Sequence, residues 1–285
     1  MKKAIRKIGQ VLLAFVPTIV TLGLQIAVTI PVTFYYFGAL GYMGKLPKFG
    51  MDITNWLNDI LSSDYTVYVT VVWGTLSMII FILWYYRLHD RSGDVALSKT
   101  LNLYSVGGMI LIVVGMQVSI EYFYTIAEKG LPDIFQQYQQ LMDMSNYGTI
   151  ATLIMVIYGI VVAPIHEEYL NRGVTLHFAD RAMPFFAANI FQALLFGIIH
   201  MNLVQGSYAF IIGLALGYIY RVAKNIWVPI LFHMMFNLFG TFVPMMPLST
   251  DKTSAYVFVG VLGLVISISG FVLFNASLRM RDENL

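Results

Sequence analysis

Long uncharged stretches dominate the pattern of hydrophobic and polar positions in this chain. Division of the sequence at its charged residues leaves eight stretches, and an α-helix needs roughly 20 residues to cross about 30 Å of hydrocarbon. The predicted spans are 11–36, 65–86, 100–120, 144–165, 182–203, 206–220, 225–248 and 254–278. A turn at Asn202, Gln205 and Gly206 separates the fifth span from the sixth. The pattern predicts an all-α polytopic membrane protein, a bundle of about eight transmembrane helices.

The lysines and arginines predict how these helices are oriented. Thirteen fall on the side of both termini and only four on the other side, namely Lys45, Lys48, Lys129 and Lys252. Cytoplasmic loops carry the excess of positive charge, so we expect both termini in the cytoplasm. The uncharged stretch after the basic N-terminal residues continues to Leu40 without a convincing cleavage site, which favours a retained first span. The membrane would be the plasma membrane in a bacterium and the endoplasmic reticulum in a eukaryote.

Two outer loops have apolar residues at helical spacing, which predicts amphipathic helices lying on the outer interface. The apolar positions are Ile53, Trp56, Leu57, Ile60 and Leu61 in the first loop, and Ile134, Phe135, Tyr138, Leu141 and Met142 in the second. Small residues on the sixth span, Ala209, Gly213 and Gly217, predict that a neighbouring helix packs closely there.

The amino-acid composition limits which catalytic groups and metal ligands are available. Hydrophobic residues make up 58% of the 285 residues and charged ones 11%, and there is no cysteine. Thiolate catalysis and disulfides are therefore excluded, and a metal would need histidine and carboxylate ligands. The net charge of +2 gives no reason to expect a nucleic-acid partner. We divide the chain into three N-terminal spans with the amphipathic loops (residues 1–140) and a five-span bundle (residues 141–285).

One polar stretch interrupts the apolar pattern near the middle of the chain. Charged side chains cost several kcal/mol in hydrocarbon, so Glu167, Glu168 and Arg172 require a reason to be there. On a helix, Glu168 and Arg172 face each other, whereas Glu167 is turned about 100° away. One carboxylate can then be structural and the other chemical. The alternative is that these charges only cap a cytoplasmic helix end.

Later spans add polar groups that favour a site. His200 ends the fifth span, and His233 and Asn237 lie four residues apart on the seventh. At 1.5 Å per residue from the cytoplasmic helix ends, Glu167, His233 and Asn237 would lie roughly 16, 10 and 16 Å deep, and His200 roughly 24 Å. This convergence requires that the fourth span continues past Arg172 to about Phe178, with a bend at Pro164. If that span ended at its charges, Glu167 would lie at the cytoplasmic surface instead.

Two familiar hydrolase signatures fail. His166-Glu167 begins like the zinc-binding His-Glu-x-x-His helix, but Leu170 occupies the position of the second histidine. The chain contains no Gly-x-Ser-x-Gly elbow. Serine chemistry and classical zinc-helix chemistry are therefore poor candidates.

Four ordered motifs lie between roughly residues 145 and 245. They are Glu167-Glu168-x-x-x-Arg172-Gly173, Phe196-x-x-x-His200, Gly213-Leu-Ala-Leu-Gly217-Tyr-Ile-Tyr220, and Asn225-Ile-Trp-Val-Pro-Ile230 leading into His233-x-x-x-Asn237. In this segment the chain resembles the CAAX protease and bacteriocin-processing family (CPBP, or Abi) of intramembrane proteases, which includes the CAAX prenyl endopeptidase. The chain departs from the family at His166, Tyr169 and Asn171, where more apolar residues are expected.

The resemblance implies hydrolysis of a peptide bond within the membrane. Glu167 and His200 would position and deprotonate a water, with Glu168 and Arg172 as the supporting pair. His233 and Asn237 would donate hydrogen bonds to the tetrahedral oxyanion. Glu167, His200 and His233 also fit a zinc site with a water as fourth ligand. We favour the glutamate mechanism without a cofactor, because no two ligands have the local spacing of a zinc helix.

Two other classes of function fit parts of the pattern. A proton-coupled transporter also buries glutamate and histidine, but it is expected to show related halves or paired broken helices, which this sequence lacks. A noncatalytic scaffold or immunity protein of the same fold would have no need for the full set of catalytic residue types. The expected partners are the lipid bilayer and a peptide or protein substrate, such as a prenylated protein or a leader peptide.

Overall fold

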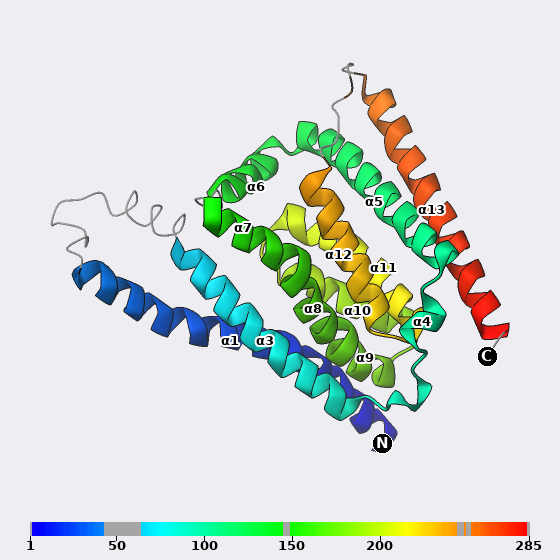
Figure 1. The fold of residues 1–285 in the computed structure, drawn as a ribbon, viewed down its shortest axis with the longest axis horizontal. Helices are drawn as coiled ribbons and strands as arrows, with labels where there is room; N and C mark the ends of the chain where they lie inside the picture. Colours follow the sequence, from blue (N-terminus) through cyan, green and yellow to red (C-terminus); the bar gives the residue numbers. More distant parts are fainter. Residues whose placement is uncertain (1, 43–63, 145–148, 244–247, 249–251, 284–285) are drawn as a thin grey trace.

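The computed structural model describes residues 2–42, 64–144, 149–243, 248 and 252–283, and these contain no β-strand. The predicted all-α membrane fold is confirmed. The elements outside the central helix are α1 (Lys2–Tyr42), α3 (Asp64–Leu88), a short 3-10 turn (Arg91–Gly93), α4 (Leu97–Thr100), α5 (Leu103–Gly130), α6 (Pro132–Met144), α10 (Phe185–Ile198), α11 (Leu203–Ala223), α12 (Trp227–Phe242) and α13 (Thr253–Glu283). The chain termini lie at one end of the bundle, and α6 lies at the other (Figure 1).

A helix occupies each of the eight predicted spans, but the helices differ in length. Within the described ranges, six are long and apolar enough to cross a membrane, and α10 and α12 are shorter apolar helices. With 14 and 16 residues, α10 and α12 extend only roughly 21 and 24 Å. His200 therefore lies two residues beyond the end of α10, whereas His233 and Asn237 lie within α12.

The fourth span is longer than the charge-bounded range 144–165. Helix continues without a break through α7 (Thr149–Ile157), a π-helical turn (Tyr158–Val162), α8 (Ala163–Glu168), a second π-helical turn (Tyr169–Thr175) and α9 (Leu176–Ala182). We call residues 149–182 the site helix. The charges do not end this helix because Glu168 and Arg172 pair with each other inside it. The convergence of polar residues needed this extension.

Packing places the site helix in the interior of the molecule. On one side it contacts α1 and α3, and on the other it contacts α10 and α12. The site helix runs between the α1–α3 pair and the α5–α13 pair in Figure 1. Its central residues from Glu168 to Leu176 are all buried. A rigid central helix with buried polar groups is the frame on which a site can be built.

Small residues set two of the helix contacts. As predicted, Gly213 of α11 lies against α10, where an added Cβ would lie 3.1 Å from Ala193 Cβ. The sequence did not single out a second pair, in which Gly115 of α5 and Gly263 of α13 bring the two helix backbones together. Van der Waals contact of this kind drives helix association where no hydrophobic effect is available.

One of the two predicted amphipathic loops can be compared with the structure. The second loop is the helix α6, as its apolar periodicity predicts. The first, with Ile53, Trp56, Leu57, Ile60 and Leu61, lies outside the described residues. Because α6 contacts both α5 and α11, it covers one end of the bundle.

Candidate active site

A buried ion pair forms the centre of the site. Arg172 Nη1 donates to Glu168 Oε1 at 2.7 Å, and both side chains have no exposed surface. The second guanidinium nitrogen, Nη2, donates to the carbonyl of Gly213 at 3.0 Å. That carbonyl is reachable because Gly213 has no side chain. The predicted pairing of Glu168 with Arg172 is present, and it ties the site helix to α11.

His233 joins the same carboxylate from α12. Its Nδ1 lies 2.8 Å from Glu168 Oε1, the oxygen that also accepts from Arg172. A carboxylate can only accept, so Nδ1 is the protonated nitrogen and Nε2 faces away from Glu168. His233 Nε2 lies 3.7 Å from Glu167 Oε2. Glu168 thus orients the histidine, whose other nitrogen points toward the neighbouring glutamate.

Glu167 has a different environment from Glu168. Its side chain keeps 19% of its surface exposed, compared with none for Glu168. Tyr158 and Tyr208 lie close enough to Glu167 to interact with it electrostatically. Asn171 does not contact this carboxylate, because its side chain donates to the Glu167 backbone carbonyl at 2.8 Å. The two adjacent glutamates therefore separate into a fully buried carboxylate, bound to Arg172 and His233 through Oε1, and a partly accessible one.

The ring of Phe196 connects the ion pair to both histidines. The Arg172 guanidinium carbon lies 4.9 Å from the ring centroid, a cation–π contact. His233 and His200 pack edge-on against the ring at centroid distances of 5.8 and 5.0 Å. His200 Nδ1 donates to the Phe196 carbonyl at 2.7 Å, which leaves Nε2 as the nitrogen that can accept.

Asn237 lies one turn beyond His233 on α12. Its amide nitrogen donates to the carbonyl of Gly159 at 2.8 Å, within the first π-helical turn of the site helix. That amide carries a second hydrogen, which Gly159 does not use. Asn237 therefore holds α12 against the site helix and still has one donor to offer.

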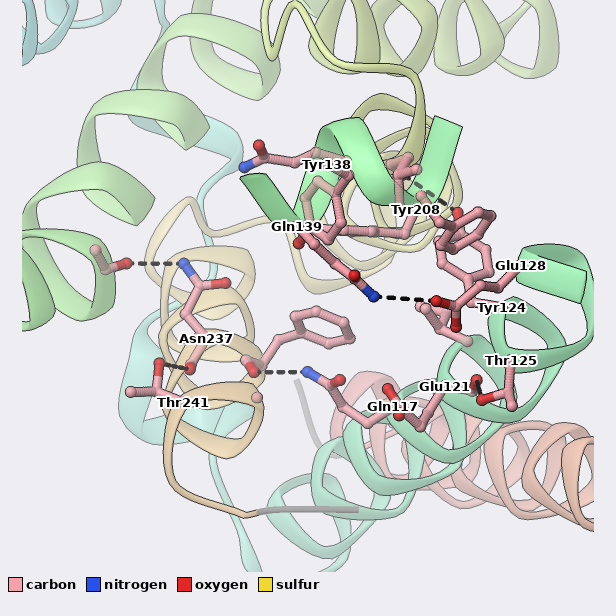
Figure 2. A pocket seen from close by; sticks show the side chains of 17 residues that line it. Gln117, Glu121, Tyr124, Thr125, Glu128, Tyr138, Gln139, Tyr208, Asn237 and Thr241 are labelled. Atoms are coloured by element: carbon pink, nitrogen blue, oxygen red, sulfur yellow. Dashed lines mark hydrogen bonds between the residues drawn. The ribbon is translucent and has the colours of Figure 1, made fainter. Parts of the chain in front are cut away.

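A cavity opens beside Asn237, at the end of the bundle away from the termini (Figures 1 and 2). Its volume is about 660 Å³, within the usual range for ligand pockets. Residues of α5, α6, α11 and α12 and of the site helix form its wall, and Tyr208, which interacts with Glu167, is among them. Asn237 and Gly159, which are hydrogen-bonded to each other, join the cavity to the candidate site, whereas Glu167 is not part of the cavity wall.

Comparison with known proteins agrees with the motifs in this segment. Residues 149–239 match the family described as type II CAAX prenyl endopeptidase Rce1-like. The predicted family resemblance is confirmed. The chain is also 27% identical over 147 residues, 51% of its length, to the protein named "Putative membrane peptidase YdiL" from Bacillus subtilis (strain 168). The chain spans 57% of that relative's length. No solved structure matches the chain significantly.

The Rce1-like segment contains all six residues that the motifs single out, and the structure brings four of them into direct contact. Glu167, Glu168, Arg172 and His233 form one network. His200 reaches this network only through Phe196, and Asn237 adjoins it through α12. The sequence had shown Phe196 only as the first residue of a spacing motif. It gave no signal for Tyr158 or Tyr208.

The suggested zinc ligands do not gather around one point. Among the described residues, no group of three histidine and carboxylate side chains lies close enough to hold a metal ion. The Glu167–His233 pair is close, but His200 binds the Phe196 carbonyl and packs against its ring. The Rce1-like segment in this geometry does not fit a three-ligand zinc site, so we derive no step through a metal.

Proposed function

We propose that the chain is an intramembrane endopeptidase in which Glu167 is the general base. The observation that carries the proposal is the difference in partners and exposure between the two glutamates. Glu168 is committed to Arg172 and His233, whereas Glu167 keeps part of its side chain exposed. The match to a family of endopeptidases supports hydrolysis as the reaction.

In this proposal, a water bound by Glu167 attacks the carbonyl carbon of the scissile peptide bond, and the Nε2 of His200 holds the same water only after His200 moves in from beyond Phe196. Glu167 accepts the proton as the new C–O bond forms and the carbonyl oxygen becomes an oxyanion. The spare amide hydrogen of Asn237 stabilises that oxyanion, and His233 adds a second donor when its Nε2 is also protonated. When the C–N bond breaks, Glu167 returns the proton to the leaving amine. The products are a new carboxyl group and a new amine.

The first prediction tests the base. Glu167→Gln keeps the size of the side chain but removes its basicity, so cleavage should fall by about 100-fold or more. Purified protein in liposomes would be incubated with a library of quenched fluorescent peptides, and cleavage sites would be mapped by mass spectrometry. The thermal midpoint should not change. Glu283→Gln, an exposed glutamate at the end of α13, is the matched control and should cleave normally.

The same preparation tests whether a metal takes part. We expect substoichiometric zinc by elemental analysis and full cleavage after treatment with a strong chelator. Stoichiometric zinc that disappears together with activity in His200→Ala and His233→Ala would make a metal-bound water the nucleophile. Normal cleavage by Glu167→Gln would show that Glu167 is not the base and would contradict the proposal. Absence of any cleavage by the wild-type protein would favour a noncatalytic protein of the same fold.

A further inference from the structure

The cavity beside Asn237 has an unusual distribution of charge. Glu121 and Glu128 both line it, and none of its described lining residues is a lysine or arginine. They lie seven residues apart on α5, which places them on one helix face roughly 10 Å from each other. Their charges interact across the cavity wall. The whole chain has a net charge of +2, so the negative charge of the cavity is a local feature.

No cation in the described part of the chain neutralises these two carboxylates. Glu128 accepts a hydrogen bond from the amide of Gln139 at 3.0 Å, and neither glutamate forms an ion pair there. Lys129 directly follows Glu128 but turns away, with its Nζ 5.0 Å from the ring centroid of Tyr256 on α13. Two glutamates in one wall without counter-charge are complementary to a cationic ligand.

The rest of the lining suits a polypeptide. Amides of Gln117, Gln139 and Gln205 and rings of Tyr124 and Tyr138 surround the space, and Figure 2 shows several of these groups around it. Gln117 donates one bond to the Phe236 carbonyl at 3.0 Å and has further capacity, because a carboxamide has two donors and an acceptor. An extended chain presents unpaired N–H and C=O groups, which such amides can satisfy. A lipid tail would leave these polar groups unpaired.

The cavity also extends from the acidic end to the candidate site. Glu121 and Glu128 are on α5, and Asn237 and Tyr208 lie on the facing wall formed by α12 and α11. A segment bound along this wall would therefore bring a peptide bond toward Asn237 of the candidate site while its neighbouring residues pass the carboxylates.

We propose that the cavity binds the substrate of the endopeptidase as an extended polypeptide segment whose lysine or arginine side chain pairs with Glu121 and Glu128. The segment enters from the end of the bundle opposite the chain termini. This inference rests on the proposed function for its substrate role, but the cavity's preference for a basic peptide can be measured by binding alone.

The cleavage experiment compares otherwise identical quenched peptides that carry lysine, norleucine or glutamate at one position, moved in turn along the peptide. The wild-type protein should cleave the lysine peptides about tenfold faster in kcat/KM at low salt, with the preference confined to one side of the scissile bond. E121Q/E128Q should lose that preference and cleave lysine and norleucine peptides with similar kcat/KM. E121K/E128K should prefer glutamate. The control is Asp133→Asn, an exposed carboxylate on α6 outside the cavity lining, which should behave as wild type.

Binding separates this inference from the proposed function. Fluorescence anisotropy of labelled lysine and norleucine peptides would be measured on the Glu167→Gln protein in neutral phosphatidylcholine nanodiscs. Selective binding of the lysine peptide that disappears in E121Q/E128Q supports the cavity even if no peptide is ever cleaved. Cleavage without any preference for lysine, or a preference that Asp133→Asn abolishes equally, overturns the cavity assignment and leaves the proposed function standing. Neither cleavage nor selective binding would overturn both.

Discussion

Glu168 Oε1 accepts from two donors that come from different helices. Arg172 lies on the site helix and His233 lies on α12, and both side chains are buried. Burial of an ion pair contributes little by itself, because desolvation offsets the attraction between the charges. Removing one partner costs much more, since it leaves the other charge buried and uncompensated. Glu168 is therefore where stability and the orientation of His233 are linked.

We predict that Glu168→Gln and Arg172→Met each lower the free energy of unfolding by about 3 kcal/mol or more, and that the double variant loses less than the sum. Each single change leaves a buried group without its partner, whereas the double change removes both. Thermal unfolding in detergent measures the stabilities, and peptide cleavage measures activity. Additive effects would show that Glu168 and Arg172 are not coupled. A stable Glu168→Gln protein that is inactive beside an active Glu167→Gln protein would mean that the roles of the two glutamates are exchanged.

At the scale of single residues, helical periodicity predicted the contacts within one helix and missed those between helices. The four-residue spacing of Glu168 and Arg172 was enough to predict their pair, which is present. Nothing in the spacing shows that Phe196 lies between Arg172 and the two histidines, because that contact depends on how α10 packs. The distance between His200 and the other zinc candidates depends on packing for the same reason.

At the scale of secondary-structure elements, the site helix contains two π-helical turns. The first turn, Tyr158–Val162, directly precedes Pro164, where the sequence predicted a bend. Proline lacks the N–H that an α-helix needs for its i−4 bond, and a wider turn before it absorbs the missing bond. The sequence marks the proline but not the wider turn. The second turn, Tyr169–Thr175, has no such marker; it is buried and packs against α1 and α3.

We predict that α5 and α13 tolerate no side chain where their backbones meet. Gly115→Ala should lower the free energy of unfolding by about 1–3 kcal/mol, because its methyl group would lie 2.5 Å from the backbone nitrogen of Ser267. Gly107→Ala on the same helix is the control, since its methyl group would meet only Leu273 at 3.8 Å. Thermal unfolding compares the two. Equal stabilities would show that the helices separate easily.

For the whole molecule, the distribution of charge and the even number of spans lead to a prediction of topology. Reporter fusions after Lys99 and Arg221 should be cytoplasmic, and fusions after Lys129 and Lys252 should be external, because positive residues concentrate in cytoplasmic loops. The arrangement in Figure 1, with both termini at one end of the bundle, agrees with an even number of crossings. If the Lys99 and Lys129 fusions reported the same side of the membrane, the third predicted span would not cross it.

The overall architecture was largely predictable, whereas the cavity was not. Uncharged stretches predicted the helices because hydrocarbon excludes unpaired backbone and charge alike. The cavity, however, combines α5 and α6 with helices of the Rce1-like segment, and residues in the first 140 had matched no motif. Glu121 and Glu128 are ordinary helix-surface residues in the sequence. Only packing against α11 and α12 gives them a common space.

The two π-helical turns also change the angular positions of side chains around the axis of the site helix. Each wider turn shifts the direction of every side chain that follows, so α8 is rotated relative to both flanking segments. The direction in which Glu167 points therefore depends on the count of residues on either side of it. A single insertion or deletion there would rotate this carboxylate by about 100°, whereas a substitution would leave its direction unchanged. In this helix, chain length is as specific a requirement as residue identity.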